Sequence, residues 1–186
     1  MSLADFESLY AREQDPWGYR SREYEREKYA ATLAACGSGP FASALELGAS
    51  IGVFTELLAP RCRQLTTIDG APTAVRTAQQ ALRRHRNVRV LLGQIPDAIP
   101  VQPVDLVVAS EILYYLDSGA LAATLEAVSG VLATEGRMVA VHWRPTGPDR
   151  PLSADAVHAS LRTLQWLEEV DDRSTDDYLL NVYERS

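Results

Sequence analysis

The chain has 186 residues, 46% of them hydrophobic, which suits one domain that is large enough to bury a core. Its formal net charge is −7, and an acidic chain repels phosphate backbones, so a nucleic-acid partner is disfavoured. No apolar run approaches the roughly 20 residues of a membrane helix, and the first residues lack the pattern of a signal peptide. We therefore expect a cytoplasmic protein without a membrane partner, with one domain over residues 1–186.

The first 36 residues precede the regular part of the pattern. Residues 5–20 are aromatic and polar, and the run Asp15-Pro16-Trp17-Gly18 breaks any helix there. Residues 21–35 predict a helix, because strong helix formers fill its first turns and the run Cys36-Gly37-Ser38-Gly39-Pro40 stops it.

Short apolar runs then alternate with helical patterns. Strands are predicted at 43–47, 65–68, 88–92, 104–109 and 137–142, and helices at 52–60, 71–85, 118–133 and 154–165. This alternation indicates parallel strands joined by crossovers. Residues 166–171 and 177–184 follow as two consecutive strands, which pair antiparallel because no helix separates them. The pattern predicts an α/β three-layer sandwich whose mostly parallel sheet ends in an antiparallel hairpin.

The first motif with chemical content is Glu46-Leu47-Gly48-Ala49-Ser50-Ile51-Gly52, which follows a predicted strand and opens a helix. Glycines at such a turn let the backbone bend tightly and approach a ligand, while the helix N-terminus presents free N–H groups. Taken alone, the run is explained about as well by a purely structural turn.

A second motif strengthens the ligand interpretation. The strand at 65–68 ends in Asp69 and Gly70, roughly 20 residues past the glycine turn, where a nucleotide fold places an acid on the ribose hydroxyls. A carboxylate suits a cis-diol because its two oxygens accept two donors. The alternative is that Asp69 caps the helix that begins near Pro72, but capping alone explains the joint pattern poorly.

The acid in front of the first glycine separates two cofactors. Dinucleotide sites use G-x-G-x-x-G, whose small residues admit a pyrophosphate, whereas here the pattern is Glu46-x-Gly48-x-Ser50-x-Gly52. A carboxylate repels a pyrophosphate but attracts the ammonium of a methionine moiety. The sequence therefore favours S-adenosylmethionine over NAD. An NAD(P)-dependent oxidoreductase and a non-catalytic cofactor-binding relative are the alternatives.

Two runs resemble class I methyltransferases, and more narrowly the nodulation-protein-S-like group. They are Ala44-Leu45-Glu46-Leu47-Gly48 with Asp69, and Asp105-Leu106-Val107-Val108-Ala109-Ser110-Glu111-Ile112-Leu113-Tyr114-Tyr115-Leu116. Asp15-Pro16-Trp17, Tyr24–Tyr29 and Phe54–Pro60 add to the likeness, whereas Ser50 departs from the glycine common at its position in methyltransferases. The resemblance implies a Rossmann-like fold of seven strands.

The resemblance also implies a function. It is transfer of a methyl group from S-adenosylmethionine to an oxygen or nitrogen of a small acceptor, a sugar or amino sugar, by a monomer or homodimer. Residues 1–36 would form an N-terminal lid and helix over the cofactor. The cofactor-binding residues that it implies are Trp17, Tyr24, Lys28, Glu46, Gly48, Ala49, Gly52, Asp69, Gly70, Gln94, Ile95, Ser110 and Glu111.

Within this set, Glu46 and Gly48 would border the methionine end of the cofactor, and Gln94 and Ile95 would flank the adenine. Lys28 would pair with the cofactor carboxylate.

Lid residues Trp17 and Tyr24 would cover the ligand, although aromatic side chains are also commonly buried as plain core. Ser110 and Glu111 would end their strand beside the sulfonium.

The catalytic candidates are His142 and Glu111. His142 follows Val141 at the carboxyl end of a predicted strand, where ligands bind in open α/β sheets, and histidine titrates near neutrality. It is a candidate general base for a hydroxyl acceptor, and a hydrogen-bonded loop histidine is the equal alternative. His142, Asp155 and His158 lack the spacing of a metal site, so no metal is expected.

Overall fold

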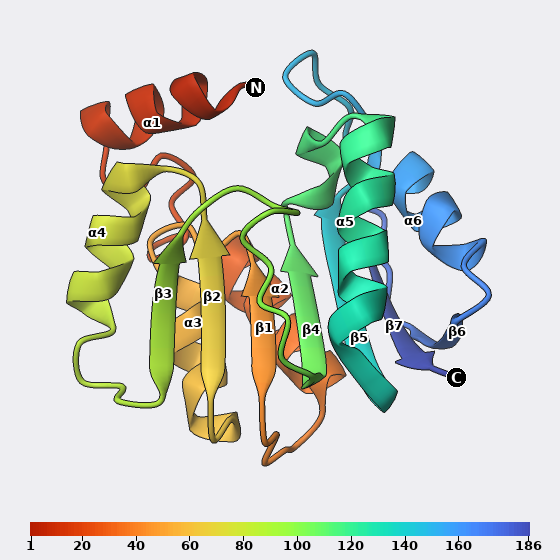
Figure 1. Cartoon of the computed structure of the whole chain (residues 1–186). Coiled ribbons are helices and arrows are strands. Elements are labelled where there is room, and N and C mark those ends of the chain that lie inside the picture. Colours follow the sequence, from red (N-terminus) through yellow and green to blue (C-terminus); the bar gives the residue numbers. More distant parts are fainter.

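The computed structural model describes residues 1–186 and contains a seven-stranded sheet with helices on both faces (Figure 1). The strands are β1 (Ala44–Leu47), β2 (Leu65–Asp69), β3 (Val88–Leu92), β4 (Val104–Ser110), β5 (Leu132–Trp143), β6 (Leu167–Asp172) and β7 (Tyr178–Arg185). Their order is β3-β2-β1-β4-β5-β7-β6, and β7 runs antiparallel to both β5 and β6, whereas the other pairs are parallel. The predicted Rossmann-like sheet with a C-terminal antiparallel hairpin is confirmed.

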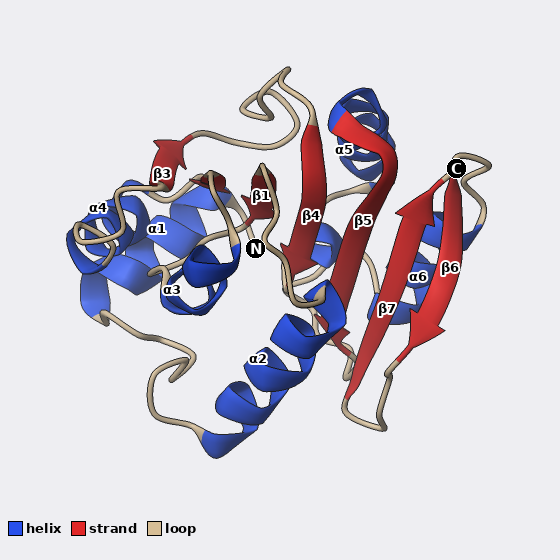
Figure 2. Ribbon diagram, turned by 90° about the horizontal axis from the view of Figure 1, so that it is seen from below, coloured by secondary structure: helices blue, strands red, loops and turns tan.

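The helices form the two outer layers. They are α1 (Leu3–Arg12), α2 (Glu23–Cys36), α3 (Val53–Leu58), α4 (Pro72–Ala81), α5 (Ser118–Val131) and α6 (Ala154–Arg162), with short 3-10 turns η1 (Ala59–Arg61) and η2 (Leu113–Tyr115). Figure 2 shows α2 and α5 on opposite faces of β4 and β5. None of these helices has the length and apolar character needed to cross a membrane.

The core lies on both faces of the sheet because successive side chains of a strand point to opposite sides. On β4, Leu106 and Val108 join the cluster under α2 and α3, while Val107 and Ala109 join the cluster under α5 and α6. A strand covered on both faces reads as a continuous apolar run, which is why β4 is easily predicted.

The topology creates a crevice at one edge of the sheet. β1 lies between β2 and β4, so the connections on its two sides lead in opposite directions. Ligands of open α/β sheets bind outside the carboxyl ends of the strands at such a switch point. In Figure 1 this is the upper edge, and α1 lies across it above β2 and β3.

Two elements differ from the sequence-based prediction. The expectation that no helix forms within residues 5–20 is wrong for the first part of that range. Ser2 and Asp5 form a reciprocal capping box that starts α1, and α1 ends at Arg12 before the Asp15-Pro16 break. β5 begins at Leu132 rather than at residue 137, because Leu132 pairs with Val104 ahead of an irregularity in the β4–β5 register.

Candidate functional site

A cavity of about 260 Å³ opens at the carboxyl ends of β1, β2 and β4. Most of the residues expected to bind a cofactor line it: Trp17, Glu46, Gly48, Ala49, Asp69, Gly70, Gln94, Ile95, Ser110 and Glu111. We refer to this space as the first cavity. The fold thus brings four separate loops and the N-terminal segment to one place.

Glu46 forms the acidic floor of the first cavity. Its side chain is buried, and its Oε2 accepts hydrogen bonds from Thr55 Oγ1 at 2.6 Å and Thr67 Oγ1 at 2.8 Å. Burial raises the pKa of this carboxyl to about 7, although both hydroxyl donors act to lower it. Oε1 makes no hydrogen bond within the protein, so it is free to accept one from a cationic ligand.

The glycine turn between β1 and α3 begins two residues after Glu46 in the sequence. Gly48 has φ +80°, and a Cβ at this position would lie 3.0 Å from the Cβ of Ile112, so only glycine fits without displacement. Ser50 also adopts a left-handed conformation, with φ +49°, which explains why glycine is common at this position in related turns.

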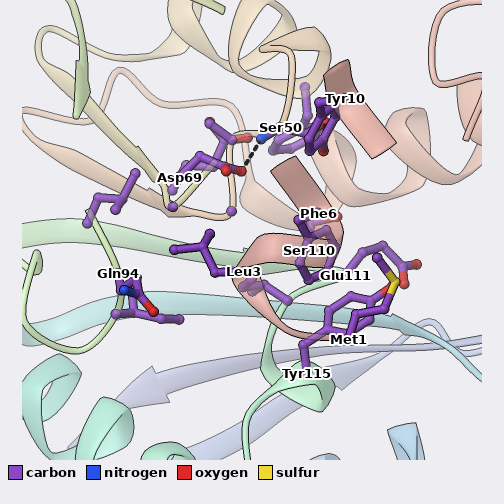
Figure 3. A pocket seen from close by; sticks show the side chains of 18 of the residues that line it. Met1, Leu3, Phe6, Tyr10, Ser50, Asp69, Gln94, Ser110, Glu111 and Tyr115 are labelled. Atoms are coloured by element: carbon purple, nitrogen blue, oxygen red, sulfur yellow. Dashed lines mark hydrogen bonds between the residues drawn. The ribbon is translucent and has the colours of Figure 1, made fainter. Parts of the chain in front are cut away.

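Asp69 lies at the end of β2 and faces the same turn. Its Oδ2 accepts a hydrogen bond from Ser50 N at 2.7 Å (Figure 3), and its Oδ1 accepts one from Ala71 N at 2.8 Å. Burial raises the pKa of Asp69, while these backbone donors lower it. The N-cap of α4 is Ala71 and not Asp69, so the capping alternative is wrong. Each oxygen keeps a lone pair for a ligand hydroxyl.

The α1 helix covers the first cavity. Leu3 lies close to Gly70, because a Cβ on that glycine would lie 2.9 Å from Leu3 Cδ1. Glu7 accepts hydrogen bonds from the backbone and side chain of Thr73, and Tyr10 Oη donates to Ser50 Oγ at 2.7 Å. Figure 3 shows the first residues of α1 among the cavity residues. The helix is therefore attached by these polar contacts and by packing of Phe6 and Tyr10 in a small apolar cluster.

Glu111 closes the other end, just past β4. It is held in a left-handed conformation with φ +56°, which is uncommon outside glycine and typical of functional positions. Lys28 Nζ donates to its Oε1 at 2.8 Å, while Trp143 N at 3.0 Å and Tyr114 Oη donate to its Oε2. Every neighbour donates, so both oxygens of Glu111 act as acceptors.

A second cavity of about 350 Å³ adjoins the first and shares Trp17, Tyr19, Glu111 and Tyr115 with it. We call it the second cavity. Its other lining residues come from the start of α2 and from loops near the ends of β4, β5 and β7: Arg22, Tyr24, Glu25, Lys28, Tyr114, Trp143, Asp149, Arg150 and Asp177. Glu111 therefore stands at the boundary between two spaces.

Three residues expected at the cofactor lie elsewhere. Tyr24 and Lys28 line the second cavity only, and Lys28 Nζ is held between Glu25 at 3.0 Å and Glu111 at 2.8 Å. Lys28 is thus not directed at the first cavity. Gly52 is the N-cap of α3 with φ +83°, and a Cβ there would lie 3.0 Å from Leu82 Cδ1, so its role is to let α3 pack.

The structure argues against His142 as a general base. Its side chain is completely buried and lines neither cavity. Leu113 N donates to its Nε2 at 3.2 Å, its Nδ1 lies 3.0 Å from His158 Nε2, and His158 Nδ1 lies 2.6 Å from Asn181 Oδ1. With Nε2 of His142 as an acceptor, its Nδ1–H donates to His158, which in turn donates to Asn181. Burial lowers the pKa of both histidines, which fits this neutral chain.

The first cavity also has lining residues outside the expected cofactor-binding set: Met1, Leu3, Phe6, Tyr10, Tyr19, Tyr29, Ser50, Phe54, Ile68, Gly93, Ile112, Tyr115 and Leu116. The α1 members had a detectable signal, because Leu3, Phe6 and Tyr10 recur at helical spacing behind the Ser2–Asp5 capping box. Most of the others lie within a few residues of a predicted one along the chain.

Comparison with known proteins identifies the family of the chain. The family model described as Nodulation protein S (NodS) matches residues 5–146. Nodulation protein S of Sinorhizobium fredii is 34% identical over 128 residues, which are 68% of this chain and 59% of that protein. The Rhizobium tropici protein is 35% identical over 103 residues, 55% of this chain and 43% of that protein. The chain thus spans about half the length of these curated relatives.

Solved structures match over more of the chain. The N-methyltransferase NodS from Bradyrhizobium japonicum WM9, in complex with S-adenosyl-L-homocysteine, has a TM-score of 0.89 and 26% identity over 100% of this chain and 99% of that one. A methyltransferase candidate from Pseudomonas syringae has a TM-score of 0.78 and 34% identity over 88% of this chain and 100% of that one. Because the family model matches residues 5–146, which are most of the chain, this chain belongs to the nodulation protein S (NodS) family.

Proposed function

We propose that this protein transfers a methyl group from S-adenosylmethionine to an amine nitrogen of a small acceptor, an amino sugar. The observation that carries the proposal is the position of Glu111, at the boundary between a cavity suited to a nucleoside amino acid and a second cavity open to an acceptor. Family membership and the likeness to an N-methyltransferase support the same reaction.

Individual residues of the first cavity match separate parts of S-adenosylmethionine. Glu46 Oε1 makes no hydrogen bond within the protein and suits the methionine ammonium, and each oxygen of Asp69 keeps a lone pair for a ribose hydroxyl. Gln94 and Ile95 provide a polar and an apolar wall for the adenine. S-adenosylmethionine, when bound, supplies an electrophilic methyl group, so the protein mainly has to align the acceptor.

Glu111 is the residue to perform that alignment. Its carboxylate is fixed by three donors and borders both cavities, so it can accept a hydrogen bond from an acceptor N–H and orient the nitrogen lone pair towards the methyl group. The lining of the two cavities contains carboxylates and no histidine. Such a lining favours an amine, because a neutral amine is already nucleophilic and needs less help from a strong base than a hydroxyl does.

Residues 1–36 act as the lid in this proposal. α1 supplies Leu3, Phe6 and Tyr10 to the first cavity, and Trp17 lines both cavities. A ligand that enters under α1 has to separate the Glu7–Thr73 and Tyr10–Ser50 contacts and the packing beside them, which is a local opening rather than a rearrangement of the sheet. The closed lid would exclude water from the cofactor and the acceptor during methyl transfer.

The two alternative functions predict different ligands or different activity for the same cavity. A nicotinamide-dependent oxidoreductase would place a pyrophosphate beside Glu46, and the buried carboxylate there repels it. A non-catalytic relative would bind the cofactor and give no turnover.

Methyl transfer to glucosamine and to N-acetylglucosamine, followed by mass spectrometry, tests the proposal. We expect a methylated product only from the free amine. Glu111→Gln should lower kcat about 10- to 100-fold, whereas the exposed Glu126→Gln control should leave it unchanged. Product from neither sugar, or equal activity of Glu111→Gln, would contradict it.

A further inference from the structure

Arg150 is a cation of the second cavity whose side chain is largely buried but makes no hydrogen bond within the protein. It lies in the loop between β5 and α6, and its side chain is 7% exposed. Its guanidinium lies 5.0 Å from the ring centroid of Tyr114 and 4.9 Å from that of Trp143. Both distances are those of cation–π contacts, so the two rings restrict the position of the guanidinium.

The guanidinium makes no hydrogen bond within the protein. Its Nε is buried and has no hydrogen-bond partner, because Oδ1 of Asp149, with which it forms an ion pair, is 3.6 Å away and too far for a hydrogen bond. A buried donor without a partner costs free energy, so such a group is expected where a ligand completes it. Tyr24 Oη, on the same cavity, is also buried without a partner.

The loop itself leaves space for this side chain. A Cβ on Gly147 would lie 2.6 Å from Oδ1 of Asp149 and 2.9 Å from Nη2 of Arg150, and Arg150 N donates to Gly147 O at 3.3 Å to close the turn. A larger residue at 147 would press on both members of this ion pair. The backbone therefore positions Arg150 from one side and the aromatic rings from the other.

Charge is distributed unevenly over the cavity. The carboxylates of Glu25 and Glu111 both pair with the single ammonium of Lys28. Negative charge is therefore in excess there and favours a ligand group that is cationic or bears an N–H. Tyr114 links the two ends, because its hydroxyl donates to Glu111 while its ring contacts Arg150. An acceptor amine placed at Glu111 thus extends its other end towards the unsatisfied guanidinium.

We propose that Arg150 binds an oxyanion of the acceptor, a carboxylate or a phosphate, so that the acceptor is an amine that carries an anionic substituent. This inference rests on the proposed function and narrows its substrate class. Guanidinium binds such oxyanions through two parallel N–H donors, which a lysine does not reproduce. Asp177 lines the same cavity and disfavours an anion near itself, whereas Asp149 pairs with Arg150 at Nε and leaves both Nη groups without a protein partner.

Calorimetry on the protein saturated with S-adenosylhomocysteine tests this inference without relying on turnover. The probes are glucosamine, glucosamine 6-phosphate and 2-amino-2-deoxyglucuronate, which separate phosphate from carboxylate. The variants are Arg150→Met and Arg150→Lys. Arg144→Met is the matched control, because Arg144 is in the same loop, pairs with Asp155 and lines neither cavity. Binding of S-adenosylhomocysteine to each variant reports that it is folded.

We expect at least one anionic sugar to bind the wild type and the control about tenfold or more tightly than glucosamine. Arg150→Met should remove this advantage, and Arg150→Lys should keep only part of it. No preference for the anionic sugars, no binding of any probe, or a preference that survives Arg150→Met would each overturn the inference. If the preference holds but no amine is methylated, the proposed function fails and the anion site stands.

Discussion

Replacement of Glu46 by Gln is the sharpest test of the cofactor assignment. Glu46 is buried under the first cavity, and its pKa is raised from 4.5 to about 7 by burial. This difference corresponds to about 3 kcal/mol between the two protonation states. The folded protein keeps a proton that the unfolded chain releases, so the stability of the unligated protein is full below pH 4.5 and falls as the pH rises towards 7.

Cofactor binding should show the opposite dependence. The methionine ammonium needs the ionised carboxylate, so the affinity for S-adenosylhomocysteine should fall about tenfold from pH 8 to pH 6 as Glu46 is protonated. Glu46→Gln should bind about 10- to 100-fold more weakly at pH 8 and lose most of this pH dependence. Urea unfolding of the unligated variant should lack the stability decrease between pH 4.5 and 7.

The assay is isothermal titration of S-adenosylhomocysteine at pH 6, 7 and 8. The control is Glu56→Gln, since Glu56 is exposed on α3 and lines neither cavity. Asp69 also has a pKa raised by burial, and comparison of wild type with Glu46→Gln separates the two carboxyl groups. If Glu46→Gln kept the affinity and the pH profile of the wild type, Glu46 would not bind the methionine ammonium.

Three further predictions concern other parts of the site. Asp69→Ala should weaken calorimetric binding of S-adenosylhomocysteine about 10- to 100-fold, and unchanged binding would remove Asp69 from the ribose site. Residues 3–12 should gain hydrogen-exchange protection when S-adenosylhomocysteine binds, and equal protection in both states would count against a lid. His142→Ala should lower the free energy of unfolding in urea by about 2–4 kcal/mol, because Leu113 N and His158 lose their partner. A large loss of kcat at unchanged stability would instead restore His142 as a base.

The sheet and the glycine turn are predictable because their signals are local. Strand β4 is an apolar run, the turn after Glu46 combines glycines with a helix start, and Asp69 ends the next strand at the spacing of a nucleotide fold. Placement of Gln94 and Ile95 at the cavity required the family resemblance, since two residues after a strand carry no chemical signature of their own.

The second cavity is not predictable in this way, because its residues are distant in sequence. Arg22, Arg150 and Asp177 come from three separate segments, and only tertiary packing brings them together. The burial of His142 has the same origin. β7 pairs with β5 and carries Asn181, and α6 carries His158, so a strand-end histidine becomes an interior one.

Calorimetric titration of the wild-type protein with S-adenosylhomocysteine and, separately, with NAD tests most directly whether the first cavity is an S-adenosylmethionine site. A site built on the buried Glu46 carboxylate and the Asp69 fork predicts saturable one-to-one binding of S-adenosylhomocysteine and no measurable heat with NAD. Binding of NAD with equal or higher affinity, or no binding of S-adenosylhomocysteine at pH 8, would contradict it.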